Sequence, residues 1–108
     1  MLAEVAGGTQ TAVINTEHTL ATLTTGKTYV LVTSTANLVA GDTLILRIYT
    51  KVRAGGASTL AYAVVFANLQ SENVKYSVPV PANVEFLATL QQIEGVGRAF
   101  VWAVLSLD

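Results

Sequence analysis

The segment from Gly41 to Arg53, GDTLILRIYTKVR, constrains the fold more than any other stretch. Its residues alternate in character, and alternate side chains of a strand point to opposite faces. One face is mainly apolar and consists of Leu44, Leu46, Ile48, Thr50 and Val52. The other is mainly basic and consists of Ile45, Arg47, Tyr49, Lys51 and Arg53. The pattern predicts a strand with one face in a core and the other facing outward.

Polar groups are too scarce to cover the surface of a lone small domain. Charged residues make up 12% of the 108-residue chain, about half the usual share, whereas hydrophobic residues make up 52%. We therefore expect other subunits to cover part of the surface, in a homo-oligomer. The net charge of −1 argues against a nucleic-acid partner. The chain has no cysteine, which excludes disulfides and thiolate metal sites.

The sequence shows no targeting or membrane signal. The first ten residues, MLAEVAGGTQ, lack the basic and apolar regions of a secretory signal. The longest apolar run, Ser58 to Ser71, is too short and too polar to span a membrane. We expect a protein that is made in the cytoplasm and has no membrane partner.

Short apolar or alternating runs recur about every ten to twelve residues with turn residues between them, a spacing typical of a sandwich or barrel. Helix signals are nearly absent. The predicted strands are 9–15, 17–24, 28–35, 43–53, 58–68, 72–78, 84–93 and 98–107. Residues 1–8 are expected to be an N-terminal arm with a hinge at Gly7-Gly8, and residues 9–108 a single domain. Eight strands match an antiparallel jelly-roll-like β-sandwich, and a seven-stranded immunoglobulin-like sandwich is the main alternative.

The strand over 58–68 carries no charge on either face, although a strand of a simple sandwich usually has one wet face. One face consists of Leu60, Tyr62, Val64 and Phe66. The other consists of Ala61, Ala63, Val65 and Ala67. We predict that the second, smaller face takes part in self-association.

The basic face is the candidate partner-binding surface, and its members are Arg47, Tyr49, Lys51 and Arg53. It could contact an acidic partner, or Tyr49 could stack on a sugar or base with support from arginine. The competing interpretation is a solvated outer face that keeps the sheet soluble.

No group of residues has the spacing of a catalytic, cofactor-binding or metal site. His18 is the only histidine and has no further ligand at metal-binding spacing. The seven acids are scattered, and the serines lie in no nucleophile motif. Asp42 is interpreted as a turn residue, and Phe100 and Trp102 as core side chains. We expect a protein that is not an enzyme and needs no cofactor.

Four segments together resemble small structural proteins of tailed bacteriophages, of about 110 residues, encoded near the capsid genes. They are the strand Gly41 to Val52 (GDTLILRIYTKV), the hairpin Ala54 to Ala57 (AGGA), the crossover Tyr76 to Pro81 (YSVPVP) and the closing strand Gly95 to Leu105 (GVGRAFVWAVL). The resemblance covers roughly residues 17–107.

This resemblance implies a non-enzymatic virion protein. By analogy at the level of the fold, such a protein binds the outside of the head as decoration or cement, commonly as a trimer, with the major capsid protein as its partner. An alternative is a virion-exposed carbohydrate-binding or adhesin module that uses Tyr49, Tyr62 or Trp102. A further alternative is a component of the tail or of head completion.

Overall fold

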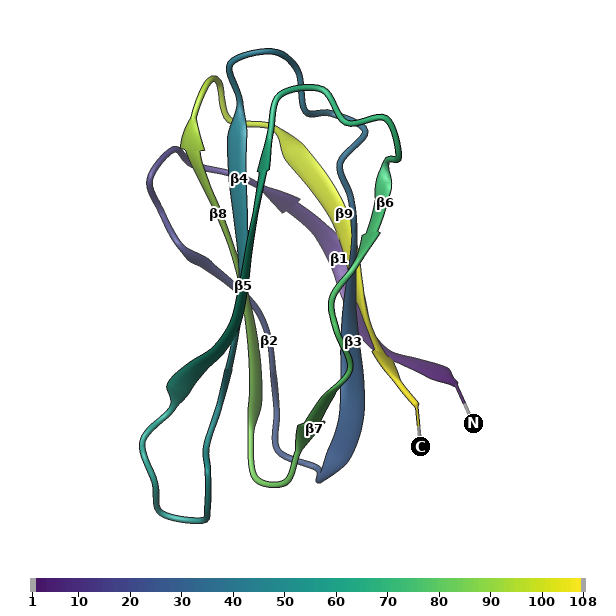
Figure 1. Cartoon of the computed structure of the whole chain (residues 1–108), viewed down its shortest axis with the longest axis vertical. Coiled ribbons are helices and arrows are strands. Elements are labelled where there is room, and N and C mark those ends of the chain that lie inside the picture. Colours follow the sequence, from purple (N-terminus) through teal and green to yellow (C-terminus); the bar gives the residue numbers. More distant parts are fainter. Residues whose placement is uncertain (1, 108) are drawn as a thin grey trace.

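The computed structural model describes residues 2–107, which fold into two antiparallel β-sheets packed face to face (Figure 1). The predicted all-β sandwich is confirmed. The strands in chain order are β1 (Ala3–Thr11), β2 (His18–Leu23), β3 (Lys27–Ser34), β4 (Thr43–Thr50), β5 (Thr59–Ala67), β6 (Val74–Tyr76), β7 (Val80–Ala82), β8 (Phe86–Glu94) and β9 (Ala99–Ser106). The described residues include no helix long and apolar enough to cross a membrane.

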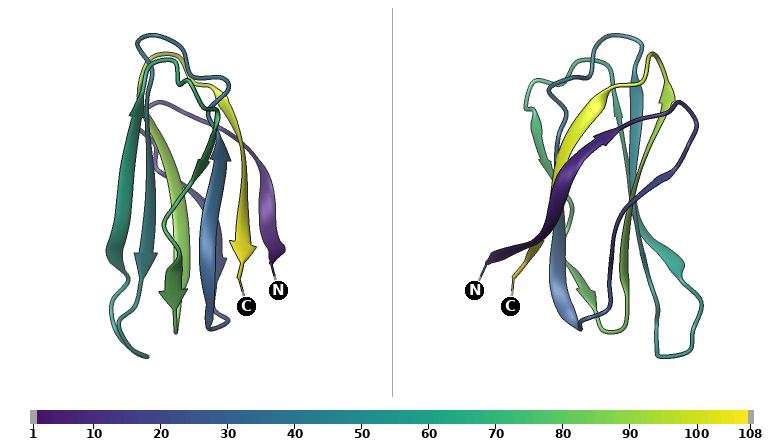
Figure 2. Two further views of the ribbon diagram at one scale, coloured as in Figure 1. Left: turned by 45° about the vertical axis from the view of Figure 1, so that its right-hand side comes forward. Right: turned by 180° about the vertical axis from the view of Figure 1, so that it is seen from behind.

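The early strands pair with the late strands as one long antiparallel ribbon. The pairs are β1 with β9, β2 with β8, β3 with both β6 and β7, and β4 with β5. The ribbon is wrapped so that successive pairs lie alternately in two sheets (Figure 2). Sheet A has the order β1-β9-β3-β6, with β7 also on the outer edge of β3, and sheet B has the order β2-β8-β4-β5.

The sixth predicted strand, 72–78, is shorter than expected and is followed by a separate strand. Pro79 and Pro81 have no backbone N–H, so this stretch cannot form a continuous ladder beside β3. Ser77 bridges the gap: its Oγ accepts a hydrogen bond from the Leu31 N–H at 2.9 Å, and its own N–H donates to the Leu31 carbonyl at 2.8 Å. The resulting edge of sheet A consists of two three-residue strands, β6 and β7.

The prediction of an N-terminal arm was wrong for residues 3–8, and Met1 lies outside the described residues. These residues belong to β1, which pairs with β9 from Ala3 opposite Ser106 to Thr11 opposite Ala99. The Gly7-Gly8 pair is not a hinge. A Cβ on Gly7 would lie 3.2 Å from the backbone carbonyl oxygen of Trp102, so the close approach of β9 favours a glycine here.

The core lies between the two sheets and follows the predicted alternation. Leu44, Leu46 and Ile48 of β4 are buried, as expected from the apolar face of that strand. Phe100 is also fully buried, and Trp102 is partly buried against the same core. Register and burial together divide β4, β8 and β9 into inward-facing and outward-facing residues.

Candidate functional site

The predicted basic face is shorter than the sequence indicated. Because β4 ends at Thr50, only Arg47 and Tyr49 lie on the outer face of sheet B as strand residues. Lys51 and Arg53 lie in the connection to β5. The four residues therefore do not form one continuous stripe along a strand.

A carboxylate that is not part of the predicted basic face neutralises the charge at the centre of that face. Glu17, just before β2, accepts hydrogen bonds through Oε2 from Thr89 Oγ1 at 2.6 Å and from the Tyr49 hydroxyl at 2.7 Å. Arg47 Nη1 lies 3.6 Å from the same oxygen and donates to Gln91 Oε1 at 2.7 Å. The outer face of sheet B thus carries a polar network that is largely satisfied within the chain.

These contacts shift the pKa values of two members of the network. The hydrogen bond from Thr89 is the main cause that lowers the pKa of Glu17 below its ordinary value; burial opposes it, and Tyr49 and Arg47 add to the lowering. The hydrogen bond to Glu17 is the main cause that raises the pKa of Tyr49. Both shifts favour an ionised Glu17 beside a protonated Tyr49 at neutral pH.

The rest of the predicted stripe is also partly paired. Lys51 Nζ lies 3.7 Å from Glu85 Oε2, whereas Arg53 is exposed and makes no ion pair with any residue between 2 and 107. Two of the three cations therefore have acidic neighbours in the same chain. The binding of an acidic partner by this surface stays a prediction, and the structure provides only Arg53 as an unpaired cation for it.

The predicted self-association residues are exposed on β5, an edge strand of sheet B. Ala63, Val65 and Ala67 face outward, and Val65 has 58% of its surface exposed. Ala61 is the extra residue of a β-bulge, since Tyr62 lies opposite Ile48 but Leu60 lies opposite Tyr49. The predicted alternation over the whole strand was therefore wrong at Leu60, which shares the outward register.

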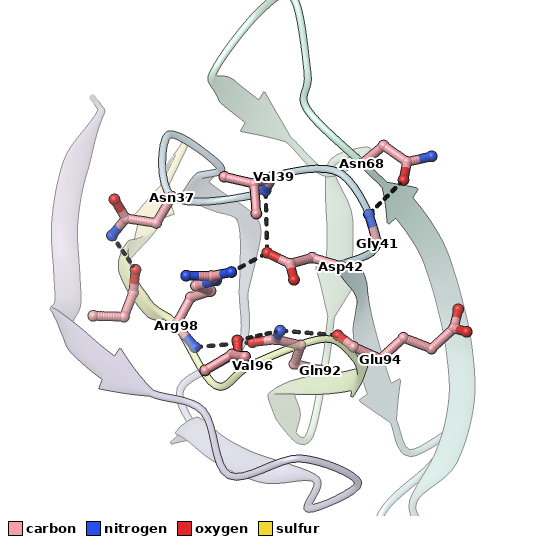
Figure 3. Close-up of polar contacts among 10 residues, drawn as sticks. Asn37, Val39, Gly41, Asp42, Asn68, Gln92, Glu94, Val96 and Arg98 are labelled. Carbon is pink, nitrogen blue, oxygen red and sulfur yellow. Dashed lines mark hydrogen bonds and ion pairs between the residues drawn. The ribbon is translucent and has the colours of Figure 1, made fainter.

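The sequence did not reveal a polar cluster that fixes the loops at one end of the sandwich (Figure 3). We call this end the loop end; it comprises the connections 12–17, 35–42, 68–73 and 95–98. Asp42 is only 1% exposed, and its Oδ2 accepts hydrogen bonds from Arg98 Nε at 3.0 Å and from the Val39 N–H at 3.1 Å. Asp42 thus holds its own turn, as predicted, and also ties it to the start of β9.

Gln92 is the second anchor of the loop end and is fully buried. Its side-chain nitrogen donates to the carbonyls of Glu94 at 2.9 Å and Val96 at 2.8 Å, and its side-chain oxygen accepts from the Arg98 N–H at 3.0 Å (Figure 3). The amide therefore satisfies three backbone groups of the β8–β9 turn. Its inward direction could have been predicted, because Gln92 continues the inward series of Phe86, Ala88 and Leu90.

Each loop of the loop end contains one residue with a positive φ angle. They are Asn15 (65°), Gly41 (92°), Asn68 (64°) and Gly95 (90°). Asn68 links two of the loops, because its side-chain oxygen accepts from the Gly41 N–H at 2.9 Å and its N–H donates to the Asp42 carbonyl at 2.9 Å. Specific hydrogen bonds therefore fix the conformation of the loop end.

The outer face of sheet A is mainly apolar, in contrast to the polar outer face of sheet B. Val74, Tyr76 and Val101 are 56%, 64% and 59% exposed, and Val32, Ala103 and Leu105 lie half-buried beside them. A shallow groove of about 390 Å³ crosses this face between β1, β9, β3 and β6. Among the described residues that the register places on this face, Glu4 is the only charged one. A lone domain would expose this apolar surface to water.

The aromatic residues suggested for carbohydrate binding do not form one exposed platform. Tyr49 is half-buried with its hydroxyl bonded to Glu17, and Trp102 packs against the core. Tyr62 belongs to the inward register of β5. Within residues 2–107, no three histidine or acidic side chains come close enough to hold a metal ion together.

Comparisons of the chain with protein-family models, with curated proteins and with solved structures found no match.

Proposed function

We propose that this chain is a non-enzymatic structural protein of a tailed-bacteriophage virion. In this role it binds the major capsid protein on the outside of the head, as a decoration or cement protein, and self-associates as a trimer. The outer face of sheet A carries the proposal. Its exposed Val74, Tyr76 and Val101 form an almost uncharged surface, which fits a protein whose sandwich is packed into a larger shell.

Two further features support this role. The segments that resemble phage proteins become β4, the β4–β5 connection, the β6–β7 edge and β9, which together form parts of both sheets. The ribbon pairing of β1 with β9, β2 with β8, β3 with β6 and β7, and β4 with β5 favours a jelly roll within the sandwich class.

In this proposal the contact with the shell is made by sheet A rather than by the predicted basic face. Arg47 and Lys51 already lie beside Glu17 and Glu85, so a partner would have to displace or share those acids. Apolar burial at sheet A would instead contribute about 25 cal/mol per Å², before the costs of association are subtracted.

Quantitative mass spectrometry of purified heads and tails, from phage that encodes this chain, tests the proposal. We expect a fixed copy number per head and no enrichment in tails. Purified protein added to heads that lack it should bind saturably and raise the temperature at which the shell opens. Absence from the particle, or exclusive presence in tails, would overturn the decoration role.

A further inference from the structure

Strand β5 has an open backbone edge. It is the last strand of sheet B, and among the described strands it pairs with β4 alone. A sheet edge presents unpaired N–H and C=O groups to any strand that lies alongside it. From Ser58 to Gln70 the chain contains no charged residue and no proline, the residue types that commonly keep such edges from pairing.

The other edges of the two sheets are better protected. β1 carries Glu4 and an irregular register between Glu4 and Ala6. β2 is six residues long and has an irregular register between Thr19 and Ala21. β6 and β7 are three residues each, with Lys75 in the first and Pro81 in the second. β5 has its bulge at Ala61, near its start, and its six residues from Tyr62 to Ala67 keep a regular register.

The inward-facing side chains of this regular run are incompletely covered. Tyr62, Val64 and Phe66 lie opposite Ile48, Leu46 and Leu44. The three β4 side chains are buried, yet the three β5 side chains are only half-buried. The cause lies in sheet A, whose edge above β5 consists of the short strands β6 and β7. Lys75 Nζ partly covers the gap, 5.3 Å from the centre of the Phe66 ring.

We propose that β5 pairs antiparallel with β5 of a second copy, about a two-fold axis at Val64. This rests on the self-association part of the proposed function and adds a two-fold contact, which either forms a dimer or joins two of the proposed trimers. The two copies of sheet B become one continuous eight-stranded sheet. Tyr62 then lies opposite the partner's Phe66, and Ala63 lies opposite the partner's Val65, so the aromatic pair faces inward and each small residue meets a larger one.

A second copy fits this edge better than an unrelated strand. A two-fold contact uses the same edge of both molecules, so no open β5 edge remains and pairing stops after one event. The uncharged strand offers no charge that would select a charged peptide.

Single cysteines test the register, because the chain has none of its own. Val64→Cys should form a disulfide-linked dimer under mild oxidation, since its two copies face each other across the axis. Val65→Cys should not, because its two copies lie about 8 Å apart, beyond the reach of a disulfide. A mixture of Ala63→Cys and Val65→Cys proteins should cross-link, although neither does so alone. Cross-linking of Val65→Cys alone, or of none of these, would overturn the pairing.

Sedimentation equilibrium measures the strength of the contact. The protein should contain an even number of subunits, two or, if the proposed trimers are joined, six. Val65→Lys should weaken self-association at least thirtyfold, whereas Val101→Lys on sheet A, which changes a side chain of similar exposure, should leave the Val64→Cys cross-link intact. A trimer that shows no Val64→Cys cross-link but still binds heads would refute the β5 contact and keep the proposed function. A dimer that shows the Val64→Cys cross-link, in a protein that is absent from virions, would keep the β5 contact and refute the proposed function.

Discussion

The loop end and the outer face of sheet A differ in where their side chains find partners. At the loop end, hydrogen bonds join the side chains of Asp42, Gln92 and Arg98 to groups of the neighbouring loops, so few polar groups there lack a partner. On sheet A, Val74 and Val101 are more than half exposed to solvent in the single chain. The first region therefore supports the fold, whereas the second is available for contacts with other molecules. Substitutions in the two regions should separate these roles.

Gly95→Ala, at the loop end, should lower the free energy of unfolding more than the other substitutions. Gly95 has a φ of +90°, and an added Cβ would collide with the Asp42 carboxylate. The strained φ and the overpacking together should cost about 3 kcal/mol. Gly55→Ala is the matched control, because Gly55 also has a positive φ but has open space around it. It should cost about 1 kcal/mol. Equal losses in urea unfolding would show that the loop end is not tightly packed.

Asp42→Asn should cost about 2 kcal/mol, because it removes the charge from the hydrogen bonds with Arg98 and Val39 while keeping the size of the side chain. Chemical unfolding of this variant, of Arg98→Gln and of the double variant measures the coupling. The double variant should lose less than the sum of the single variants. Additive losses would indicate that the ion pair contributes nothing to the loop end.

Glu17→Gln tests the polar network on sheet B and should lower stability by less than about 1 kcal/mol, since the carboxylate is partly exposed. The pKa of Glu17 is lowered from 4.5, so its contribution is present above pH 4.5 and is lost as the pH falls through the lowered value. The difference in stability between wild type and variant should therefore shrink below pH 4.5. The variant should also weaken the main cause that raises the pKa of Tyr49, because a neutral amide oxygen is a poorer acceptor than a carboxylate, and NMR titration of the tyrosine rings can measure the change. An unchanged Tyr49 titration would contradict the network.

Val101→Glu should change the stability of the single chain by no more than about 0.5 kcal/mol, because the side chain is 59% exposed. It should nevertheless weaken binding to heads at least about thirtyfold, since a charge would be buried at the contact. Val13→Glu is the control, as Val13 is 61% exposed in the loop that follows β1 and is not part of sheet A. Head binding that is equally sensitive to both variants would remove the distinction between the two regions.

Local patterns predicted the strands well and the long-range contacts poorly. The alternation in residues 43–50 identified the buried face of β4, because the period of two depends only on neighbours in the sequence. The Asp42–Arg98 pair joins residues 56 positions apart, and the Glu17–Thr89 bond joins residues 72 apart. These contacts follow from the ribbon topology, which no local pattern specifies. The arm was mispredicted because Gly7-Gly8 suggests flexibility unless the pairing with β9 is known.

The position of β9 in sheet A has a consequence for folding during translation. β9 follows every other described strand in the chain, yet it lies between β1 and β3 and pairs with both. Until residues 99–106 have been synthesised, sheet A is incomplete and β1 has no strand to pair with. Sheet B, whose four strands are complete at Glu94, can form earlier. Nascent chains should therefore acquire protease resistance in two steps, with the N-terminal residues protected last.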